Sequence, residues 1–396
     1  MSPGKALGQR LITKEERVNT YELDDHLILQ PDSSNRFLVL NETAGIVWKA
    51  HRRGCSLTEI CEELSCRFGI SRKQAAGDVA TVFRTMESAG TIDSEAEVNE
   101  KMSFVSAPDR STSCPAESEK DLRVAYSLWG RPFVVAYGSR RLQDMLHSYL
   151  SHLVCKEFAD APLRYALMES EKTYFVLKNG DLLSRTTDAY KVKNTLMLDI
   201  LAHCHEKERF GAVWHAAAIT CKHACILLPA ASGSGKSTLT AALIREGYGY
   251  MGDDFIVLSA SGFDALAAPF ALSIKETSWP VLKSLYPEID DLPVYSPSHK
   301  TVKFLHPPRE SFGLAFRRMP VHCIIHPRYV PGSSESMEAI SPVVSFQSLI
   351  AANAWLDTDA SNIAGFLRWL ERRKSYLMTY SSISGARRLL EAVLTV

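Results

Sequence analysis

The sequence predicts a mixed α/β protein, in which a small module of strands and helices precedes a larger α/β domain. Two observations support this prediction. Residues 19–95 contain two short β-rich runs followed by three helical stretches, and residues 206–396 mix strands and helices around a glycine-rich loop. The chain has 396 residues, which suits two or three domains.

Composition excludes several classes of protein. Hydrophobic residues make up 46% of the chain and charged residues 23%, as in an ordinary folded protein. Lys and Arg together number 45, as do Asp and Glu, so no overall basic field favours nucleic acid as a partner. The sequence has no apolar run long enough to cross a membrane and no apolar signal core at its N-terminus, so we expect a cytoplasmic protein without a membrane partner.

The front module has clear element boundaries. A polar turn at residues 31–35 separates its two β-rich runs. Ser56 and Glu59 form the pattern of a capping box, which predicts the start of a helix, and Ser71 caps the next helix. The order of two strands and three helices predicts a winged-helix-like α+β domain over residues 19–95.

Two segments separate this module from the glycine-rich loop. Residues 96–119 are polar, rich in Ser and contain two Pro, which predicts a linker. Residues 120–205 alternate strands with a helix near residues 139–154 and carry no chemical motif. We assign residues 120–205 as the front subdomain of the C-terminal region, and residues 206–396 as its core.

The glycine-rich loop has the context of a phosphate-binding loop. It follows an apolar strand at residues 224–228 and opens a helix that runs from Lys236 to Glu246. In such a loop, backbone N–H groups face the phosphates, the lysine reaches the β and γ oxygens, and the hydroxyl of Ser237 can bind Mg²⁺. Ala230 replaces the usual first glycine, which requires that this position has no positive φ. The predicted nucleotide-binding residues are Ala230, Ala231, Ser232, Gly233, Ser234, Gly235, Lys236, Ser237 and Thr238.

Two adjacent carboxylates, Asp253 and Asp254, stand at a strand edge 17 and 18 residues beyond Lys236. Beside a phosphate-binding loop, one Asp can bind Mg²⁺ and another can accept a hydroxyl proton. Adjacent like charges are costly unless a metal or cations offset them. The residues alone do not decide which Asp takes which role. His215 lies on a strand that would return beside the loop, where a lone His is more often a satisfied core residue.

These spacings resemble the catalytic core of the HPr kinase/phosphorylase family. That family has a strand His, a Ser-Gly-x-Gly-Lys-Ser loop, a Gly that ends the helix, and an Asp-Asp pair. They correspond here to His215, residues 232–237, Gly247, and Asp253 with Asp254. The resemblance implies an HPr kinase-like fold related to PEP carboxykinase, with ATP and Mg²⁺ as cofactors. It also implies a catalytic set of Asp253, His215 and Lys236, in which His215 helps to set the ionisation of the base. We predict Asp253 as that base and Asp254 as a metal ligand, with their order open.

The match is better to the HPr-kinase-related group that acts on ribosomal precursor peptides, such as lasso-peptide kinases. Thr238 follows Gly-Lys-Ser where HPr kinases commonly carry Glu, and no clear copy of their second signature is present. In the peptide-kinase group, a run resembling residues 273–276 follows the core. The resemblance makes Lys275 a further phosphate or nucleotide contact and Lys303 a weaker one, while a solvated surface role is open for both.

The front module resembles PqqD, the peptide chaperone family of pyrroloquinoline quinone biosynthesis. The residues that support this are 40–48 (LNETAGIVW), 57–60 (LTEI), 78–79 (DV) and 89–92 (AGTI), with Trp48 and Ile60 expected in the core. The family binds a leader peptide as an added strand on a sheet edge. That edge would lie near residues 37–40 here, beside the helix at residues 74–88.

DNA binding is the alternative for a winged-helix-like module. Arg72, Lys73 and Arg84 are the only basic residues of its last helix and the approach to it, and nearby acids balance them. We therefore expect no nucleic-acid partner.

Together, these observations predict an ATP-dependent kinase that phosphorylates a hydroxyl, expected to be Ser, of a precursor peptide bound through its leader to residues 19–95. A nucleotide-switched peptide-binding adaptor without phosphoryl transfer is the first alternative. A DNA-binding regulator with a kinase-like sensor domain is the second. HPr kinases are hexamers, but the added front module leaves only the possibility of a homo-oligomer open.

Overall fold

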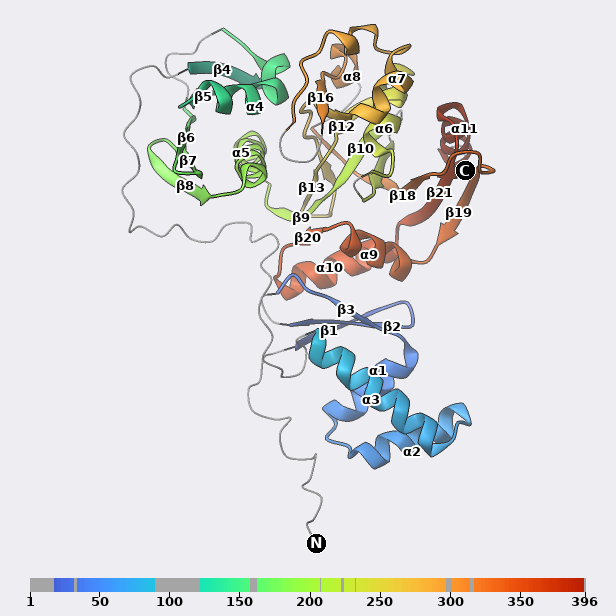
Figure 1. The fold of residues 1–396 in the computed structure, drawn as a ribbon. Helices are drawn as coiled ribbons and strands as arrows, with labels where there is room; N and C mark the ends of the chain where they lie inside the picture. Colours follow the sequence, from blue (N-terminus) through green and yellow to red (C-terminus); the bar gives the residue numbers. More distant parts are fainter. Residues whose placement is uncertain are drawn as a thin grey trace. The chain divides into compact units, whose positions relative to one another are not determined.

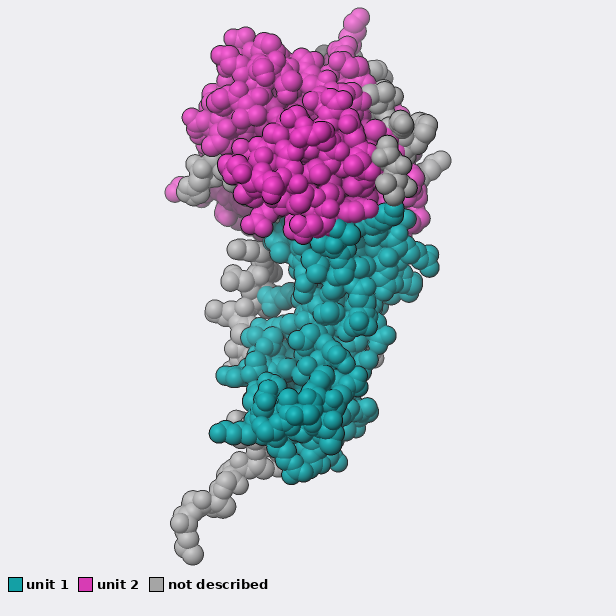
Figure 2. Space-filling view, turned by 90° about the vertical axis from the view of Figure 1, so that its right-hand side faces the viewer, with its two compact units in different colours: residues 1–99, 339–375 teal, residues 100–338, 376–396 magenta. Residues whose placement is uncertain are grey.

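The computed structural model describes residues 18–31, 34–89, 122–156, 162–206, 208–221, 224–231, 233–296, 301–313 and 317–394. The chain divides into two compact units, coloured separately in Figure 2. Unit 1 comprises residues 1–99 and 339–375, and unit 2 comprises residues 100–338 and 376–396. The expected linker at residues 96–119 lies outside the described residues. None of the described helices is both long and apolar enough to cross a membrane.

Unit 1 begins with a three-stranded antiparallel sheet in the order β1-β2-β3, followed by three helices (Figure 1). The elements are β1 (Val18–Leu23), β2 (His26–Pro31), β3 (Leu38–Leu40), α1 (Glu42–Arg52), α2 (Leu57–Phe68) and α3 (Arg72–Ser88). The first predicted β-rich run is in fact two strands, because Asp24 turns the chain with a φ of 50°. Asp tolerates this left-handed conformation better than most residues.

The predicted helix starts of unit 1 are confirmed. The Ser56 hydroxyl accepts a hydrogen bond from the Glu59 backbone N–H, and the Glu59 carboxylate accepts one from the Ser56 backbone N–H. The Ser71 hydroxyl accepts from the backbone N–H of Gln74. Trp48 and Ile60 are core residues as expected, with exposed fractions of 4% and 0%.

The sheet of unit 1 is buried on both faces. Side chains alternate along a strand, so Leu27 and Leu29 pack into the core formed with α1–α3, whereas Ile28 and Gln30 point the other way. Ile28 and Gln30 are nevertheless 0% exposed. Helices α9 (Pro342–Ala351) and α10 (Ala360–Glu371) lie on this second face, and β20 (Trp355–Leu356) lies between them in sequence (Figure 1).

Specific contacts attach residues 339–375 to the front strands. The Phe37 and Phe346 rings meet edge to face with centroids 5.5 Å apart. The Asp24 carboxylate accepts a hydrogen bond from the backbone N–H of Val343 at 3.1 Å. The sequence predicts these residues in the C-terminal domain, but in the structure they cluster with the front module.

Residues 122–206 form the first part of unit 2. Five strands form a sheet in the order β4-β5-β6-β7-β8, and β5 and β6 are parallel. The elements are β4 (Leu122–Leu128), β5 (Arg131–Tyr137), α4 (Arg140–Leu150), η1 (Ser151–Leu153), β6 (Arg164–Ser170), β7 (Thr173–Lys178), β8 (Asp181–Thr186) and α5 (Ala189–Cys204). Helix α4, capped by Ser139, confirms the helix predicted near residues 139–154.

A six-stranded sheet in the order β12-β10-β11-β18-β21-β19 is the centre of unit 2. Its strands are β10 (Ala216–Cys221), β11 (Ala224–Pro229), β12 (Gly249–Gly252), β18 (Val321–Tyr329), β19 (Ser336–Ile340) and β21 (Lys374–Tyr380). Strand β10 pairs antiparallel with β11 on one side, and β18 pairs parallel with β11 on the other. Helix α6 (Lys236–Arg245) follows β11 in the chain, and its Leu239 and Leu243 pack on this sheet.

Smaller elements surround this sheet. Strands β9 and β13 pair antiparallel, as do β13 with β14, β14 with β17, and β15 with β16. Their bounds are β9 (Phe210–Trp214), β13 (Ile256–Ser259), β14 (Ala265–Leu266), β15 (Leu272–Lys275), β16 (Val302–Leu305) and β17 (Arg318–Met319). The remaining helices are η2 (Glu276–Ser278), α7 (Trp279–Leu282), η3 (Pro287–Asp290), α8 (Arg309–Gly313) and α11 (Ile383–Leu394). The expected fold class, a mixed α/β domain behind a small strand-and-helix module, is confirmed.

Candidate active site

The glycine-rich loop, residues 230–235, connects β11 to α6 as the sequence predicts. Ala230 has no positive φ, which explains why Ala fits in place of the first glycine. Gly233 and Gly235 adopt φ of 98° and 87°, a conformation that other residues rarely reach. Ser232, also predicted in the loop, lies outside the described residues.

Two buried polar atoms at the loop have no hydrogen-bond partner among the described residues. They are the hydroxyl oxygen of Ser234 and Oδ2 of Asp253. A buried polar atom left unpaired costs about 1–3 kcal/mol, so native structures rarely keep one without a reason. Both atoms are therefore open to pairing with water or a polar ligand at the loop.

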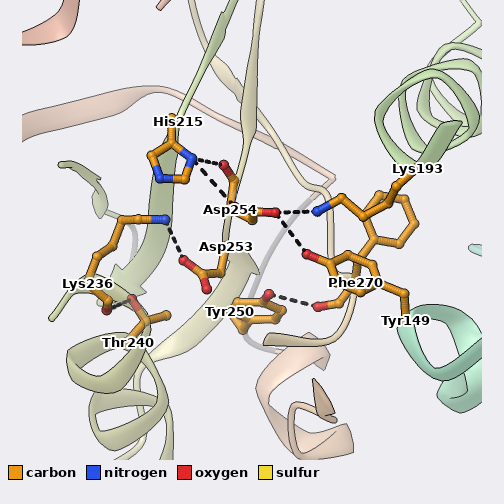
Figure 3. A network of polar contacts seen from close by, with 9 residues as sticks. All are labelled: Tyr149, Lys193, His215, Lys236, Thr240, Tyr250, Asp253, Asp254 and Phe270. Atoms are coloured by element: carbon orange, nitrogen blue, oxygen red, sulfur yellow. Dashed lines mark hydrogen bonds and ion pairs between the residues drawn. The ribbon is translucent and has the colours of Figure 1, made fainter. Parts of the chain in front are cut away.

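Lys236 and Asp253 form a buried ion pair between the loop and the acidic pair, Asp253 with Asp254. Lys236 Nζ lies 2.8 Å from Asp253 Oδ1, and the two side chains are 5% and 0% exposed (Figure 3). Asp253 follows directly after β12, the neighbour of β10 in the sheet. The sheet therefore brings together a lysine and a carboxylate that are 17 residues apart.

Asp254 occupies the turn between β12 and β13 with a φ of 75°. Its carboxylate lies 2.5 Å from Lys193 Nζ on α5 and accepts a hydrogen bond from the Tyr149 hydroxyl on α4 at 3.3 Å (Figure 3). Desolvation alone would raise the pKa of Asp254, but Lys193, Lys236 and His215 together hold this pKa well below its usual range. Asp254 is therefore ionised, and each member of the acidic pair has its own lysine.

His215 lies between β9 and β10, and it contacts the acidic pair. Its Nδ1 donates to the backbone carbonyl of Asp254 at 2.8 Å and lies 3.5 Å from Asp254 Oδ1. Burial, and next the positive charge of Lys236, lower the pKa of His215, while the two Asp charges oppose them. A neutral imidazole with its proton on Nδ1 fits this geometry and holds the acidic turn in place.

The other predicted ligand residues have distinct positions. Thr238, in the first turn of α6, donates a hydrogen bond to the hydroxyl of Ser278 at 2.6 Å. Lys275 lies beside the loop, because its Nζ is 3.9 Å from the point where a Cβ on Gly233 would stand. Lys303 is not solvated. It is 5% exposed, and its ammonium donates to the backbone carbonyls of Ile289 and Asp290 at 2.6 and 3.1 Å.

Ser237 and Asp254 supply the oxygen atoms that a hard cation such as Mg²⁺ prefers. The described residues contain no group of three or more His, Cys, Asp or Glu arranged to hold a metal ion. A magnesium ion that bridges nucleotide phosphates needs only one or two protein ligands, because phosphates and water supply the others. Ser237 opens α6 and Asp254 follows β12, and their role as magnesium ligands stays a prediction.

Sequence reasoning missed Lys193 and Tyr149. Both belong to the front segment at residues 120–205, which carries no motif, and Lys193 lies 4.7 Å from the Tyr149 ring centroid. Lys193 is 12% exposed, and the residues around it in sequence, KVKNT at 191–195, are mostly polar. No local pattern therefore distinguishes this lysine from a solvated one.

Comparison with known proteins identifies the front module. Residues 25–92 match the family model described as "Coenzyme PQQ synthesis protein D (PqqD)". No curated protein matches the chain significantly.

Two solved structures are similar to parts of the chain. "TbiB1 in Complex with the TbiA(beta) Leader Peptide" has 15% identity and a TM-score of 0.19, covering 21% of this chain and 96% of that one. "Structure of the Hpr(Ser) kinase/phosphatase from Coxiella burnetii" has 12% identity and a TM-score of 0.23, covering 46% of this chain and 96% of that one. The family match confirms the PqqD-like module that the sequence predicts: residues 25–92 form a PqqD domain.

Proposed function

We propose that the chain is an ATP-dependent kinase that phosphorylates a hydroxyl, expected to be Ser, of a precursor peptide bound through its leader. The observation that carries the proposal is the buried pair of Lys236, at the start of α6, and Asp253, directly after β12. Asp253 Oδ2 is buried without a partner among the described residues, beside the lysine that suits a nucleotide phosphate.

The chemistry assigns one role to each charged group. Ser237 and Asp254 would hold Mg²⁺, which would neutralise charge on the phosphates. Asp254 is a poor proton acceptor because its pKa lies well below the usual range, so it suits the role of an anionic ligand. Asp253 accepts the proton of the peptide hydroxyl at Oδ2. The hydroxyl oxygen forms its bond to the γ phosphorus as the bond to the β–γ bridging oxygen breaks, and ADP leaves.

Unit 1 supplies the peptide in this proposal. Strand β3 lies at an edge of its sheet, where an extended peptide can add as a further strand. Leu38 on β3 and Val82 on α3 are partly buried apolar side chains that pack on the core of the PqqD domain. They offer an apolar lining for alternate side chains of a bound leader, whose tethering raises the local concentration of the acceptor.

The contacts of unit 1 disfavour the DNA-binding alternative. Arg72 pairs with Glu62 at 2.7 Å, and Lys49 pairs with Glu22 at 3.1 Å. Further ion pairs join Arg53 to Glu63 and Arg67 to Glu42. Phosphate binding needs basic side chains that are free to replace counterions, and these four are already matched by acids.

Intact-mass analysis distinguishes the kinase proposal from the adaptor alternative. A precursor peptide, sought among short reading frames beside the gene, is incubated with Mg-ATP and either the wild-type chain or Asp253→Asn. The kinase predicts a gain of one or more phosphoryl groups with the wild type alone. An unchanged mass with both proteins, while the peptide still binds, would support the adaptor instead.

A further inference from the structure

Two tyrosines lie against the loop on the side away from the acidic pair. Tyr329 ends β18 and Tyr380 ends β21. Their ring centroids are 5.6 Å apart with an angle of 57° between the planes. The backbone N–H of Val330 donates to the carbonyl of Tyr380 at 2.9 Å, which ties the two strand ends together. We name Tyr329 and Tyr380 the aromatic pair.

The aromatic pair touches the loop itself. A Cβ on Gly235 would lie 2.8 Å from the Tyr380 hydroxyl oxygen and 3.3 Å from Cβ of Tyr329. Tyr380 is 3% exposed, so packing already accounts for its ring. Tyr329 is 50% exposed, although a large ring beside a glycine loop usually gains by burial. Tyr329 therefore presents an open ring next to the phosphate-binding residues.

The order of the strands shows where the Tyr329 ring lies relative to the expected nucleotide site. Ligands of open α/β sheets bind at the carboxyl ends of parallel strands, and β11 and β18 are parallel neighbours. The acidic pair follows β12, beyond β10 on the other side of β11. A nucleotide whose γ phosphate faces the acidic pair extends its base away from that pair, toward β18 and Tyr329.

We propose that Tyr329 is the stacking platform for the nucleobase, an inference that rests on the nucleotide site of the proposed function. Every base has a π face, so stacking on a tyrosine ring gives affinity without strong choice among bases. We therefore expect this site to accept ATP and GTP with similar affinity.

Ligands with and without a base test the proposal. Dissociation constants of Mg-ATP, Mg-GTP and Mg-tripolyphosphate are measured by calorimetry on the full chain for the wild type, Tyr329→Ala and Tyr329→Phe. Tyr329→Ala should weaken both nucleotides about tenfold or more and leave tripolyphosphate unchanged. Tyr329→Phe keeps the ring and should stay close to the wild type. Phe68→Ala, which removes an exposed ring from unit 1, is the matched control and should change nothing.

Two results would overturn the platform. If Tyr329→Ala weakens the affinity for nucleotides and for tripolyphosphate equally, Tyr329 supports the loop. If the affinity for nucleotides is unchanged, the base does not contact Tyr329. Lys236→Ala separates this failure from that of the proposed function, because it should weaken all three ligands. A Lys236→Ala protein that binds all three normally would contradict the phosphate site itself, and the platform with it.

Discussion

The two sides of strand β11 differ in chemical character. On the side of β10 and β12, the loop faces a charged cluster of His215, Asp253 and Asp254. On the side of β18 and β21, it faces the rings of Tyr329 and Tyr380. In the proposed function, this difference separates two tasks, with charge chemistry at one end of the nucleotide and base affinity at the other. Variants on the two sides should therefore change different kinetic quantities.

The charged side also shows how the chain places a cation beside each of two adjacent carboxylates. Asp253 has Lys236 at 2.8 Å, and Asp254 has Lys193 at 2.5 Å. Two carboxylates at neighbouring positions would otherwise raise the pKa of one of them. The aromatic side needs no such compensation, because its one buried ring is neutral. Burial raises the pKa of Tyr380 further above its ordinary value.

The largest expected effect is that of Lys236→Ala, which removes the cation between the loop and Asp253. Phosphoryl transfer should fall by about a thousandfold, because a preorganised positive charge on the phosphates is lost. Leader-peptide binding, measured by fluorescence anisotropy, should stay within twofold of the wild type. Full transfer activity in this variant would remove Lys236 from the mechanism. Because Asp253 is left buried and unpaired, thermal unfolding must confirm that the variant is folded.

Lys193→Met should have the next largest effect, and it tests whether the front segment belongs to the charged side. The change removes the ammonium at Asp254 but keeps an unbranched apolar stem. Loss of such an orienting partner typically lowers activity about 10–100-fold, and here kcat should fall while the dissociation constant of Mg-ATP changes little. Lys193→Arg keeps the charge and should recover part of the rate.

Lys178→Met is the matched control for Lys193. Lys178 also pairs with a carboxylate of the front segment, Asp199, at 2.8 Å, but contacts none of the predicted site residues in the described structure. Its rate should equal that of the wild type. If Lys178→Met and Lys193→Met lower the rate equally, the effect reflects the stability of the front segment and not the position of Asp254.

The smallest effect concerns unit 1 and should leave both sides of β11 unchanged. Val82→Asp places a charge beside the apolar lining proposed for the leader, and peptide affinity should fall about tenfold. Mg-ATP affinity should not change. Leu57→Asp, at an apolar side chain of α2 that is 49% exposed, is the control and should bind peptide normally. Equal affinity for Val82→Asp and the wild type would place the leader elsewhere.

Local chemistry explains which features could be predicted. The capping box of Ser56 and Glu59 lies within three residues, and the loop lies between an apolar strand and a helix. Helix starts, the loop and the PqqD-like module are therefore readable from short patterns. The turn at Asp24 was missed because an apolar run on each side of two Asp residues also fits one longer strand.

Long-range contacts explain the rest. Lys193 and Tyr149 are 61 and 105 residues from Asp254 in sequence, and no local period encodes such a pairing. One feature of the sequence, the apolar run Leu27-Ile28-Leu29, agrees with the placement of α9 and α10 in unit 1. A strand without polar alternation is typically covered on both faces. The run predicts that the second face of the sheet is covered, but it does not identify the helices that cover it.

Transfer rate measured against ATP concentration tests the division between the two sides most directly. Single-turnover rates on the precursor peptide are compared for the wild type, Asp253→Asn and Tyr329→Ala. Asp253→Asn should lower the rate at saturating Mg-ATP by about a hundredfold or more, as expected for loss of a general base, with nucleotide affinity retained. Tyr329→Ala should reach the wild-type rate once ATP is raised about tenfold. If Asp253→Asn transfers phosphate at the wild-type rate, or if both variants fail in the same quantity, the separation of chemistry from base binding is contradicted.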